Sequence, residues 1–306
     1  MVKSIKKVSL IGLGALGIMY SEHMLNQMPY EDLRIIADAA RVKKYRENGI
    51  YCNNKRCEFN YVTPEEDVEP ADLLIFAVKY TQLQEAIKAV ERHVGKDTII
   101  LSVLNGIVSE ADIGEVYGDV HNLYCVAQGM TAVKEGNHLT FMNKGILCFG
   151  ELDATEDSEK VLSVKNFFDQ IHMPYEINNQ MQTKLWSKLL VNVGINQTVA
   201  YYGTSNQGVQ VPGEARDMMV AAMEEVVQVA RPEGVTLGQV DIDYWLRLIS
   251  SLEAEGMPSM AQDVKAGRET EVELFAGTIL NLGKKHGIDV PINKMFYKYF
   301  TEMGHD

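Results

Sequence analysis

The stretch VSLIGLGALGIMYSEHML (residues 8–25) decides the fold of the N-terminal half of this chain. A short apolar run enters a glycine turn, and a helical pattern follows directly. In such a G-x-G-x-x-G turn, Gly12 permits the tight bend, Gly14 lets a pyrophosphate approach the backbone, and Gly17 lets helix pack on strand. A second strand follows at 33–37, so the pattern predicts dinucleotide binding. The predicted cofactor-binding turn comprises Gly12, Leu13, Gly14, Ala15, Leu16 and Gly17.

Strand and helix patterns alternate through about residue 150. This alternation predicts a parallel, doubly wound sheet of the Rossmann type. Ligands bind such sheets at the carboxyl ends of the strands, where we expect Gly12, Asp38, Lys79 and Asn105 to surround one crevice. Lys79 as an ordinary surface lysine and Asn105-Gly106 as a simple turn are the alternatives. The predicted strands are 7–11, 33–37, 72–78 and 98–103, and the predicted helices are 15–27, 39–48 and 81–92.

The second half of the chain has a different pattern. After a further helix and a strand at 174–177, everything reads as helical, including 217–231 and 259–286. We therefore predict two domains, a dinucleotide-binding domain at 1–177 and an all-α substrate and catalytic domain at 178–306.

A polar stripe marks the start of the helical domain. In KLWSKLLVNVGIN (residues 184–196), Lys188, Asn192 and Asn196 stand at four-residue intervals in an otherwise apolar helix. Residues at this spacing share one helix face, and each buried polar group without a partner costs roughly 1–3 kcal/mol. Side-chain bonds to nearby backbone are the alternative for either asparagine, but for all three residues the pattern favours a ligand.

A second polar segment lies in PSMAQDVKAGRETEVELFAG (residues 258–277). Ser259 is placed to begin a helix, with a structural cap as its alternative role. We expect Glu271 on the following helix, on one face with Leu274 and Phe275, where its carboxylate needs a donor or a ligand. A buried ion pair with Arg268 is the structural alternative.

Composition limits the kinds of molecule that could bind this protein and the compartment in which we expect it. The net charge of −13 over 306 residues argues against nucleic acid or an anionic membrane. No run of about 18 apolar residues predicts a membrane span, and the lysine-rich N-terminus continues into the glycine turn rather than a cleavage site, so we expect a cytoplasmic protein. Four cysteines without CxxC spacing predict reduced thiols, although Cys52 and Cys57 could pair. Seven histidines form no ligand cluster, so no metal is expected.

Five motifs in order, GLGALG (12–17), AVK (77–79), LNG (104–106), WSKLLVNVGIN (186–196) and SMAQDVKAGRETE (259–271), resemble the ketopantoate reductase (2-dehydropantoate 2-reductase) family over essentially the whole chain. The resemblance implies NADPH-dependent reduction of 2-dehydropantoate to (R)-pantoate, a step toward pantothenate and coenzyme A. It implies Lys188 as the catalytic lysine and general acid, and Glu271 as the carboxylate that binds substrate. The remaining implied positions are Asn192, Asn196, Asn206 and Ser259 for substrate, Lys79 and Ala132 for cofactor, and Asn105 for both.

One position departs from the family pattern. Asp38 ends the second strand where reductases of this family often carry a basic residue, and an acidic side chain there favours the ribose hydroxyl of NADH. Arg41, with Lys43 or Lys44, could still bind the 2′-phosphate of NADPH. On the family resemblance we expect NADPH as the cofactor, with NAD as the alternative.

Other functions remain open from the sequence alone. A relative that reduces another branched 2-oxo acid would share this architecture. An inactive nucleotide-binding regulator is less consistent with retention of Lys188 and Glu271. Dehydrogenases of the 6-phosphogluconate and 3-hydroxyisobutyrate type carry a glycine-rich segment before their lysine, where this chain has QMQTKLWSK (residues 180–188). We expect a small-molecule 2-oxo acid as partner, in a monomer or homodimer.

Overall fold

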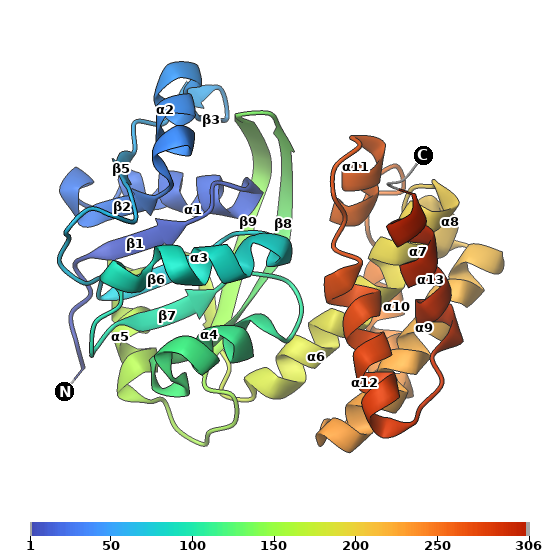
Figure 1. The fold of residues 1–306 in the computed structure, drawn as a ribbon. Helices are drawn as coiled ribbons and strands as arrows, with labels where there is room; N and C mark the ends of the chain where they lie inside the picture. The colour runs from blue at the N-terminus through green and yellow to red at the C-terminus, as the bar shows by residue number, and fades with distance from the viewer. Residues whose placement is uncertain (1, 304–306) are drawn as a thin grey trace. The chain divides into compact units, whose positions relative to one another are not determined.

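Six parallel strands form the centre of the N-terminal sheet in the computed structural model, which describes residues 2–303 (Figure 1). Their order is β5-β2-β1-β6-β7-β8, which is the Rossmann order of two βαβαβ halves that meet at β1 and β6. The doubly wound parallel sheet is therefore confirmed. The strands are β1 (Val8–Ile11), β2 (Leu33–Ile36), β5 (Asn60–Val62), β6 (Leu73–Phe76), β7 (Ile99–Ser102) and β8 (Asn122–Glu135).

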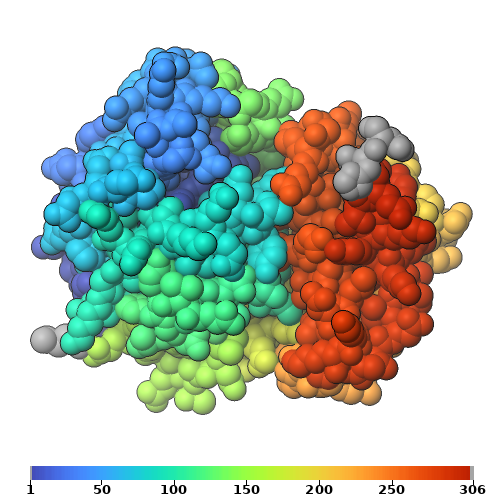
Figure 2. All heavy atoms as spheres, in the orientation of Figure 1, coloured from blue at the N-terminus to red at the C-terminus, as the bar shows by residue number. Residues whose placement is uncertain are grey.

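Helices cover both faces of this sheet because side chains of each central strand point alternately to opposite sides. On β6, Leu73 and Ile75 belong to one hydrophobic core with α1 and α5, whereas Leu74 and Phe76 belong to another with α3 and α4. Only Val42 of α2 is buried, so α2 stands on the surface of this unit (Figure 2). The helices are α1 (Ala15–Leu25), α2 (Ala39–Asn48), α3 (Leu83–Ala89), α4 (Ser109–Tyr117) and α5 (Glu159–Gln170).

A long antiparallel hairpin, which the sequence analysis missed, extends the sheet. It consists of the distal part of β8 and of β9 (His138–Gly150), joined by a turn in which Gly136 has φ +58°. Residues 130–135 alternate between half-buried and exposed, so this segment lacks the continuous apolar run of the central strands. The full sheet is therefore mixed. The short strands β3 (Tyr51–Cys52), β4 (Lys55–Arg56) and β10 (Tyr175–Ile177) complete it.

Helices make up the second compact unit, which begins at Gln182 and is described here up to residue 303. Two of its helices contain a π-turn, in which the backbone makes a wider, i→i+5 turn. The first π-turn is Asn192–Asn196 and the second is Glu273–Gly277. The other elements are α6 (Met181–Val191), α7 (Gln197–Tyr202), α8 (Gln207–Gln210), α9 (Glu214–Ala230), α10 (Gln239–Ser250), α11 (Ser259–Lys265), α12 (Thr278–His286) and α13 (Pro291–Glu302).

The prediction of a continuous helical segment at 259–286 is wrong. Helix α11 ends at Lys265, and Gly267 adopts a left-handed backbone with φ +61°. That conformation terminates α-helices, and the Arg268 amide then closes the end by donating to the Asp263 carbonyl at 2.8 Å. Regular turns resume only at Glu273.

The four cysteines are free and buried, so Cys52 and Cys57 are not joined. Burial raises the pKa of the Cys52 thiol to about 12 and that of Cys57 to about 11, which keeps both thiols protonated at neutral pH. Across residues 2–303, we find no helix with both the length and the apolar character that crossing a bilayer requires.

Candidate cofactor and substrate sites

Tight packing explains two glycines of the predicted cofactor turn. Gly12 has φ +101°, and a Cβ atom there would lie 2.6 Å from the Ala77 carbonyl oxygen. A Cβ atom at Gly17 would lie 1.9 Å from the Gly12 carbonyl oxygen. Neither position accepts a side chain without moving backbone, so strand β1, the turn and α1 approach each other more closely than any other residue would allow.

The third glycine of the turn has no such constraint. Gly14 is exposed, and the nearest atom to a Cβ there would be 3.6 Å away. Gly14 is also the N-cap of α1, whose N-terminus has no side-chain cap and no acidic residue in its first turn. An exposed helix N-terminus with uncapped N–H groups and no negative charge fits a phosphate group.

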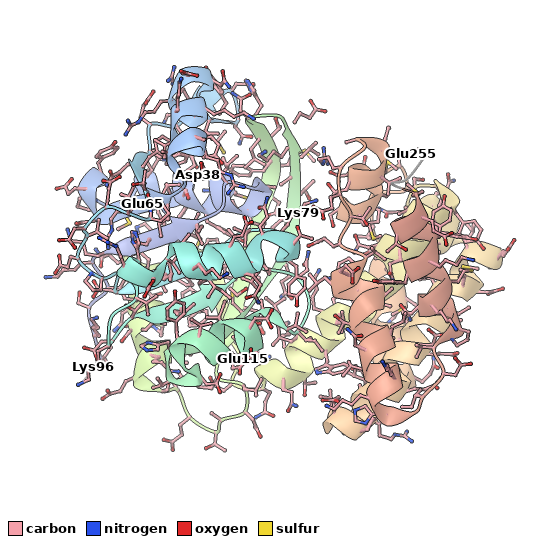
Figure 3. The ribbon with its side chains drawn as sticks, in the orientation of Figure 1. Asp38, Glu65, Lys79, Lys96, Glu115 and Glu255 are labelled. Carbon is pink, nitrogen blue, oxygen red and sulfur yellow. The ribbon has the colours of Figure 1, made fainter. Side chains whose placement is uncertain are left out.

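The carboxyl ends of the central strands are level. Ile11 pairs with Ile36 on one side and Phe76 on the other, and Phe76 pairs with Ser102. The segments that follow these residues therefore leave the sheet along one edge. They carry the glycine turn, Asp38, Lys79 and Asn105, as the sequence analysis expected (Figure 3 labels Asp38 and Lys79).

Asp38 has a structural role of its own. Its Oδ1 accepts a hydrogen bond from the Arg41 amide at 2.8 Å and so caps α2, and its Oδ2 lies 3.5 Å from Arg41 Nε. Both side chains are about half exposed. The carboxylate and the guanidinium thus stand together at the end of β2, where the ribose of a dinucleotide is bound in Rossmann folds.

The remaining residues predicted for the cofactor side lie in different settings. Lys79 is half-buried and directly precedes the 3₁₀ turn before α3, and Asn105 is half-buried in the loop after β7, next to Gly106 with φ +91°. Ala132 lies on the hairpin, at a register irregularity of β8, where it pairs with Phe141. It packs partly buried against the same core as Ala15 and Leu16, not in a strand-end loop.

In the second unit, the polar stripe spans a helix and its π-turn. Lys188 is in the last turn of α6, and Asn192 and Asn196 are the first and last residues of the first π-turn. Both asparagines are 5% exposed, and Asn196 Nδ2 lies 3.3 Å from Asn192 Oδ1. The carboxamides therefore share one face, with Lys188 one turn earlier.

The ammonium of Lys188 has an unusual environment. Burial lowers the pKa of Lys188, and the positive charge of nearby Lys184 lowers this pKa further. A lysine of this kind gives up its proton more readily than a solvated one, as proton transfer near neutral pH requires.

Two further predicted residues, Ser259 and Asn206, lie in the same unit. Ser259 Oγ donates to Asn196 Oδ1 at 3.1 Å, and the Met260 amide lies 3.3 Å from the same oxygen, so the start of α11 is attached to the first π-turn. Asn206 donates through Nδ2 to the Glu253 carbonyl at 2.9 Å. Its Oδ1 is buried and has no hydrogen-bond partner among the described residues.

Glu271 lies just before the second π-turn, so the prediction that it lies within the helix is wrong. Its carbonyl accepts from the Leu274 and Phe275 amides at 3.0 and 3.1 Å, so its backbone is bonded to the π-turn that follows. The side chain is half-buried. Arg268, proposed as its alternative partner, binds Asp263 Oδ1 at 2.7 Å.

Sequence reasoning missed the two π-turns and the buried Gln197 that follows Asn196. In an ordinary α-helix, residues 188, 192 and 196 share one face, and residue 197 lies outside that series. The available signal was a long polar side chain in an apolar run, between Ile195 and Val199.

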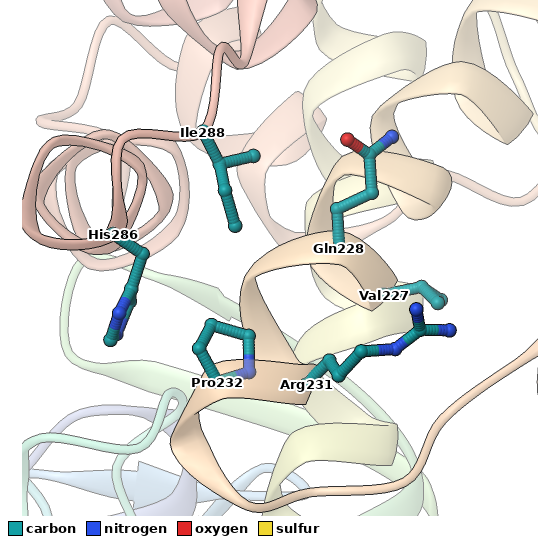
Figure 4. A pocket seen from close by; sticks show the side chains of 6 residues that line it. All are labelled: Val227, Gln228, Arg231, Pro232, His286 and Ile288. Carbon is teal, nitrogen blue, oxygen red and sulfur yellow. The ribbon is translucent and has the colours of Figure 1, made fainter.

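One hollow of the second unit, with a volume of about 470 Å³, lies apart from these residues (Figure 4). The end of α12 and the loop after it line one part, and the end of α9 with the turn after it lines the rest. None of the predicted site residues is among its lining side chains, which are Val227, Gln228, Arg231, Pro232, His286 and Ile288.

The exposed glycine turn of the Rossmann unit fits a dinucleotide cofactor, and the buried lysine of the helical unit, one turn from two carboxamides, fits acid–base chemistry; together they fit an oxidoreductase that uses a nicotinamide nucleotide. Two family profiles that match the sequence identify the family within this class. "Ketopantoate reductase PanE/ApbA" matches residues 8–154, and "Ketopantoate reductase PanE/ApbA C terminal" matches residues 180–303. The chain therefore belongs to the ketopantoate reductase family and is an oxidoreductase.

Individual proteins are similar over nearly the full length. The 2-dehydropantoate 2-reductase of Aquifex aeolicus is 24% identical over 300 residues, 96% of each chain. A dimeric ketopantoate reductase from Staphylococcus aureus superposes with a TM-score of 0.80 at 21% identity, covering 97% of this chain and 98% of its own. A D-mandelate dehydrogenase in complex with NADH superposes with a TM-score of 0.84 at 21% identity and the same coverage.

Proposed function

We propose that this protein catalyses the NADPH-dependent reduction of 2-dehydropantoate to (R)-pantoate; its Aquifex aeolicus relative is a 2-dehydropantoate 2-reductase. The main support for this proposal is the environment of Lys188. This lysine is buried, its pKa is lowered, and it lies one helical turn from the Asn192–Asn196 pair. The family profiles match residues of both units, which supports the proposed activity.

Lys188 is the proposed general acid. When bound, the nicotinamide cofactor supplies the hydride, and reduction of a ketone places negative charge on its oxygen. A protonated amine near that oxygen stabilises the charge and then donates the proton, which typically accelerates reactions about 10²- to 10⁴-fold. The lowered pKa of Lys188 suits this donation and recovery of the proton from solvent.

Carboxamide and carboxylate groups orient the substrate in this proposal. Asn192 and Asn196 offer both donors and acceptors, so they match the hydroxyl and carbonyl oxygens of a 2-oxo acid. Asn206 Oδ1, a buried acceptor without a donor in the described chain, has capacity for one more hydrogen bond. Glu271 is the proposed acceptor for the primary hydroxyl of ketopantoate.

We propose NADPH as the preferred cofactor, held at the glycine turn with its pyrophosphate at the N-terminus of α1. Arg41 is the proposed partner of the 2′-phosphate, because its guanidinium stands at the end of β2. Asp38 opposes this assignment, but its carboxylate is already engaged by Arg41. Lys43 and Lys44 add exposed positive charge on the same helix.

The test is the initial rate of cofactor oxidation with ketopantoate, measured in parallel with NADPH and NADH. Efficient turnover supports the proposed reaction, and a lower KM for NADPH supports the role of Arg41. Faster turnover of benzoylformate, the oxo acid of mandelate, would reassign the substrate and would link the protein to the D-mandelate dehydrogenase that shares its fold.

A further inference from the structure

Gln197 connects the two π-turns of the helical unit. Its side chain is fully buried at the start of α7. Nε2 donates to the Val193 carbonyl at 3.0 Å, in the first π-turn, and Oε1 accepts from the Ala276 amide at 3.2 Å, in the second. One amide group thus bonds backbone atoms of two segments that are about 80 residues apart in sequence.

The second π-turn needs this bond. The Gly277 amide donates to the Val272 carbonyl at 3.0 Å, which is the acceptor that Ala276 would use in an α-helix, and the Glu271 carbonyl is taken by Leu274 and Phe275. The Ala276 amide is therefore displaced from the helical pattern, and Gln197 Oε1 accepts it. A buried N–H group without a partner would be costly.

The first π-turn shows the matching arrangement. The backbone amide of Gln197 bonds the Gly194 carbonyl instead of the Val193 carbonyl, four residues earlier, that an α-helix would use. The Gln197 side chain donates to that Val193 carbonyl. Both π-turns therefore depend on the same side chain for a displaced backbone group.

A buried network fixes which way the Gln197 amide points. Nε2 also donates to Asn293 Oδ1 at 3.1 Å, and Asn293 Nδ2 donates to Glu225 Oε2 at 2.7 Å. Because the Glu225 carboxylate only accepts, it sets the orientation of Asn293, which in turn sets that of Gln197. The carboxylate is held by the Ile292 and Asn293 amides at 2.7 and 2.9 Å.

We infer that Gln197 is a positioning residue that fixes the first π-turn, which carries Asn192 and Asn196, against the second, which Glu271 precedes by two residues. The inference rests on the proposed function, because these are the proposed substrate-binding groups. Loss of the amide then loosens their spacing, and misplacement by about 1 Å costs up to about a hundredfold in a catalysed rate.

The experiment compares Gln197→Met with the wild type in the full-length protein. Gln197→Met is expected to raise the KM for ketopantoate about tenfold or more, with the Kd for NADPH unchanged, because the cofactor residues lie on the other unit. Hydrogen exchange of the Ala276 amide should become faster. Val229→Ala, a buried change near the end of α9, controls for a general loss of stability.

Gln197→Glu provides a second, isosteric variant. Its ionised carboxylate has no donor for Val193 or Asn293, whereas the protonated form regains one. Relative to the wild type, its substrate KM should fall as the pH is lowered. The inference would be overturned if Gln197→Met had the same KM for ketopantoate as the wild type while its Ala276 amide exchanged hydrogen faster. If the wild type reduces a different 2-oxo acid, the proposed substrate is wrong, and the KM for that acid decides the role of Gln197.

Discussion

At the scale of single residues, Lys188 gives the clearest prediction. Lys188→Ala should lower kcat by about 10²- to 10⁴-fold, because the proton donor to the developing alkoxide is removed. The Kd for NADPH should not change. Steady-state rates with ketopantoate and fluorescence titration of the cofactor measure the two quantities. An unchanged kcat would remove Lys188 from the chemistry.

Arg41 gives a second prediction at this scale. Arg41→Ala should raise the KM for NADPH about tenfold or more and leave the KM for NADH nearly constant, since only NADPH carries the 2′-phosphate that a charge-assisted bond would hold. Arg46→Ala, in the last turn of the same helix, is the matched control. Equal effects on both cofactors would contradict the role of Arg41.

At the scale of elements, the contact of β1 with α1 predicts opposite outcomes for two neighbouring glycines. Gly17→Ala brings a methyl group into the Gly12 carbonyl and should destabilise the protein by about 2 kcal/mol or more. Gly14→Ala meets only an ordinary contact at 3.6 Å, so the free energy of unfolding should change by under about 0.5 kcal/mol.

Cofactor binding should nevertheless be impaired in Gly14→Ala. Gly14→Ala places its methyl group where phosphate is proposed to approach, so it should bind NADPH more weakly despite normal stability. Urea denaturation and cofactor titration of both variants check this. Unimpaired NADPH binding by Gly14→Ala would argue against phosphate at the N-terminus of α1.

The first turn of α4 predicts a pH dependence of stability. Glu110 is 3% exposed, and burial raises its pKa to about 7, although Ser109 Oγ donates to its carboxylate at 2.8 Å. A carboxyl group whose pKa is raised by folding stabilises the folded state fully below its unfolded pKa of about 4.5, and this contribution is lost as the pH rises through 7.

Stability should therefore fall between about pH 4.5 and 7 by up to about 1.4 kcal/mol per pH unit from this group. Glu110→Gln removes the titration and should flatten the profile in that window. Urea midpoints of wild type and variant across the range measure the difference. Parallel profiles would show that folding does not raise the pKa of Glu110.

At the scale of the whole molecule, the sequence predicted what local patterns determine. The glycine turn and the apolar runs at 8–11 and 73–76 specify a strand, a bend and a parallel partner within a few residues each, so the Rossmann sheet could be predicted. The β8–β9 hairpin could not, because its outer half is only partly buried and its register depends on pairing between distant residues.

In the helical unit, too, local sequence patterns predicted only part of the structure. The alignment of Lys188, Asn192 and Asn196 follows from helical periodicity, and the structure places both asparagines in contact. The π-turns and the break after Lys265 depend on contacts across the unit, such as Gln197 with Ala276, that no local pattern contains. For the same reason Glu271 was assigned to a helix that begins two residues later.

A π-turn contains one residue more than the α-helical path it replaces, and each residue of an α-helix rotates the chain by about 100°. Deleting one residue from Asn192–Asn196 would join α6 and α7 into a regular helix and turn everything after the deletion by that angle. The buried face of α7 would then point away from its present neighbours. In this helix the number of residues is thus a more stringent constraint than their identity, and single-residue deletions should be tolerated far less well than substitutions.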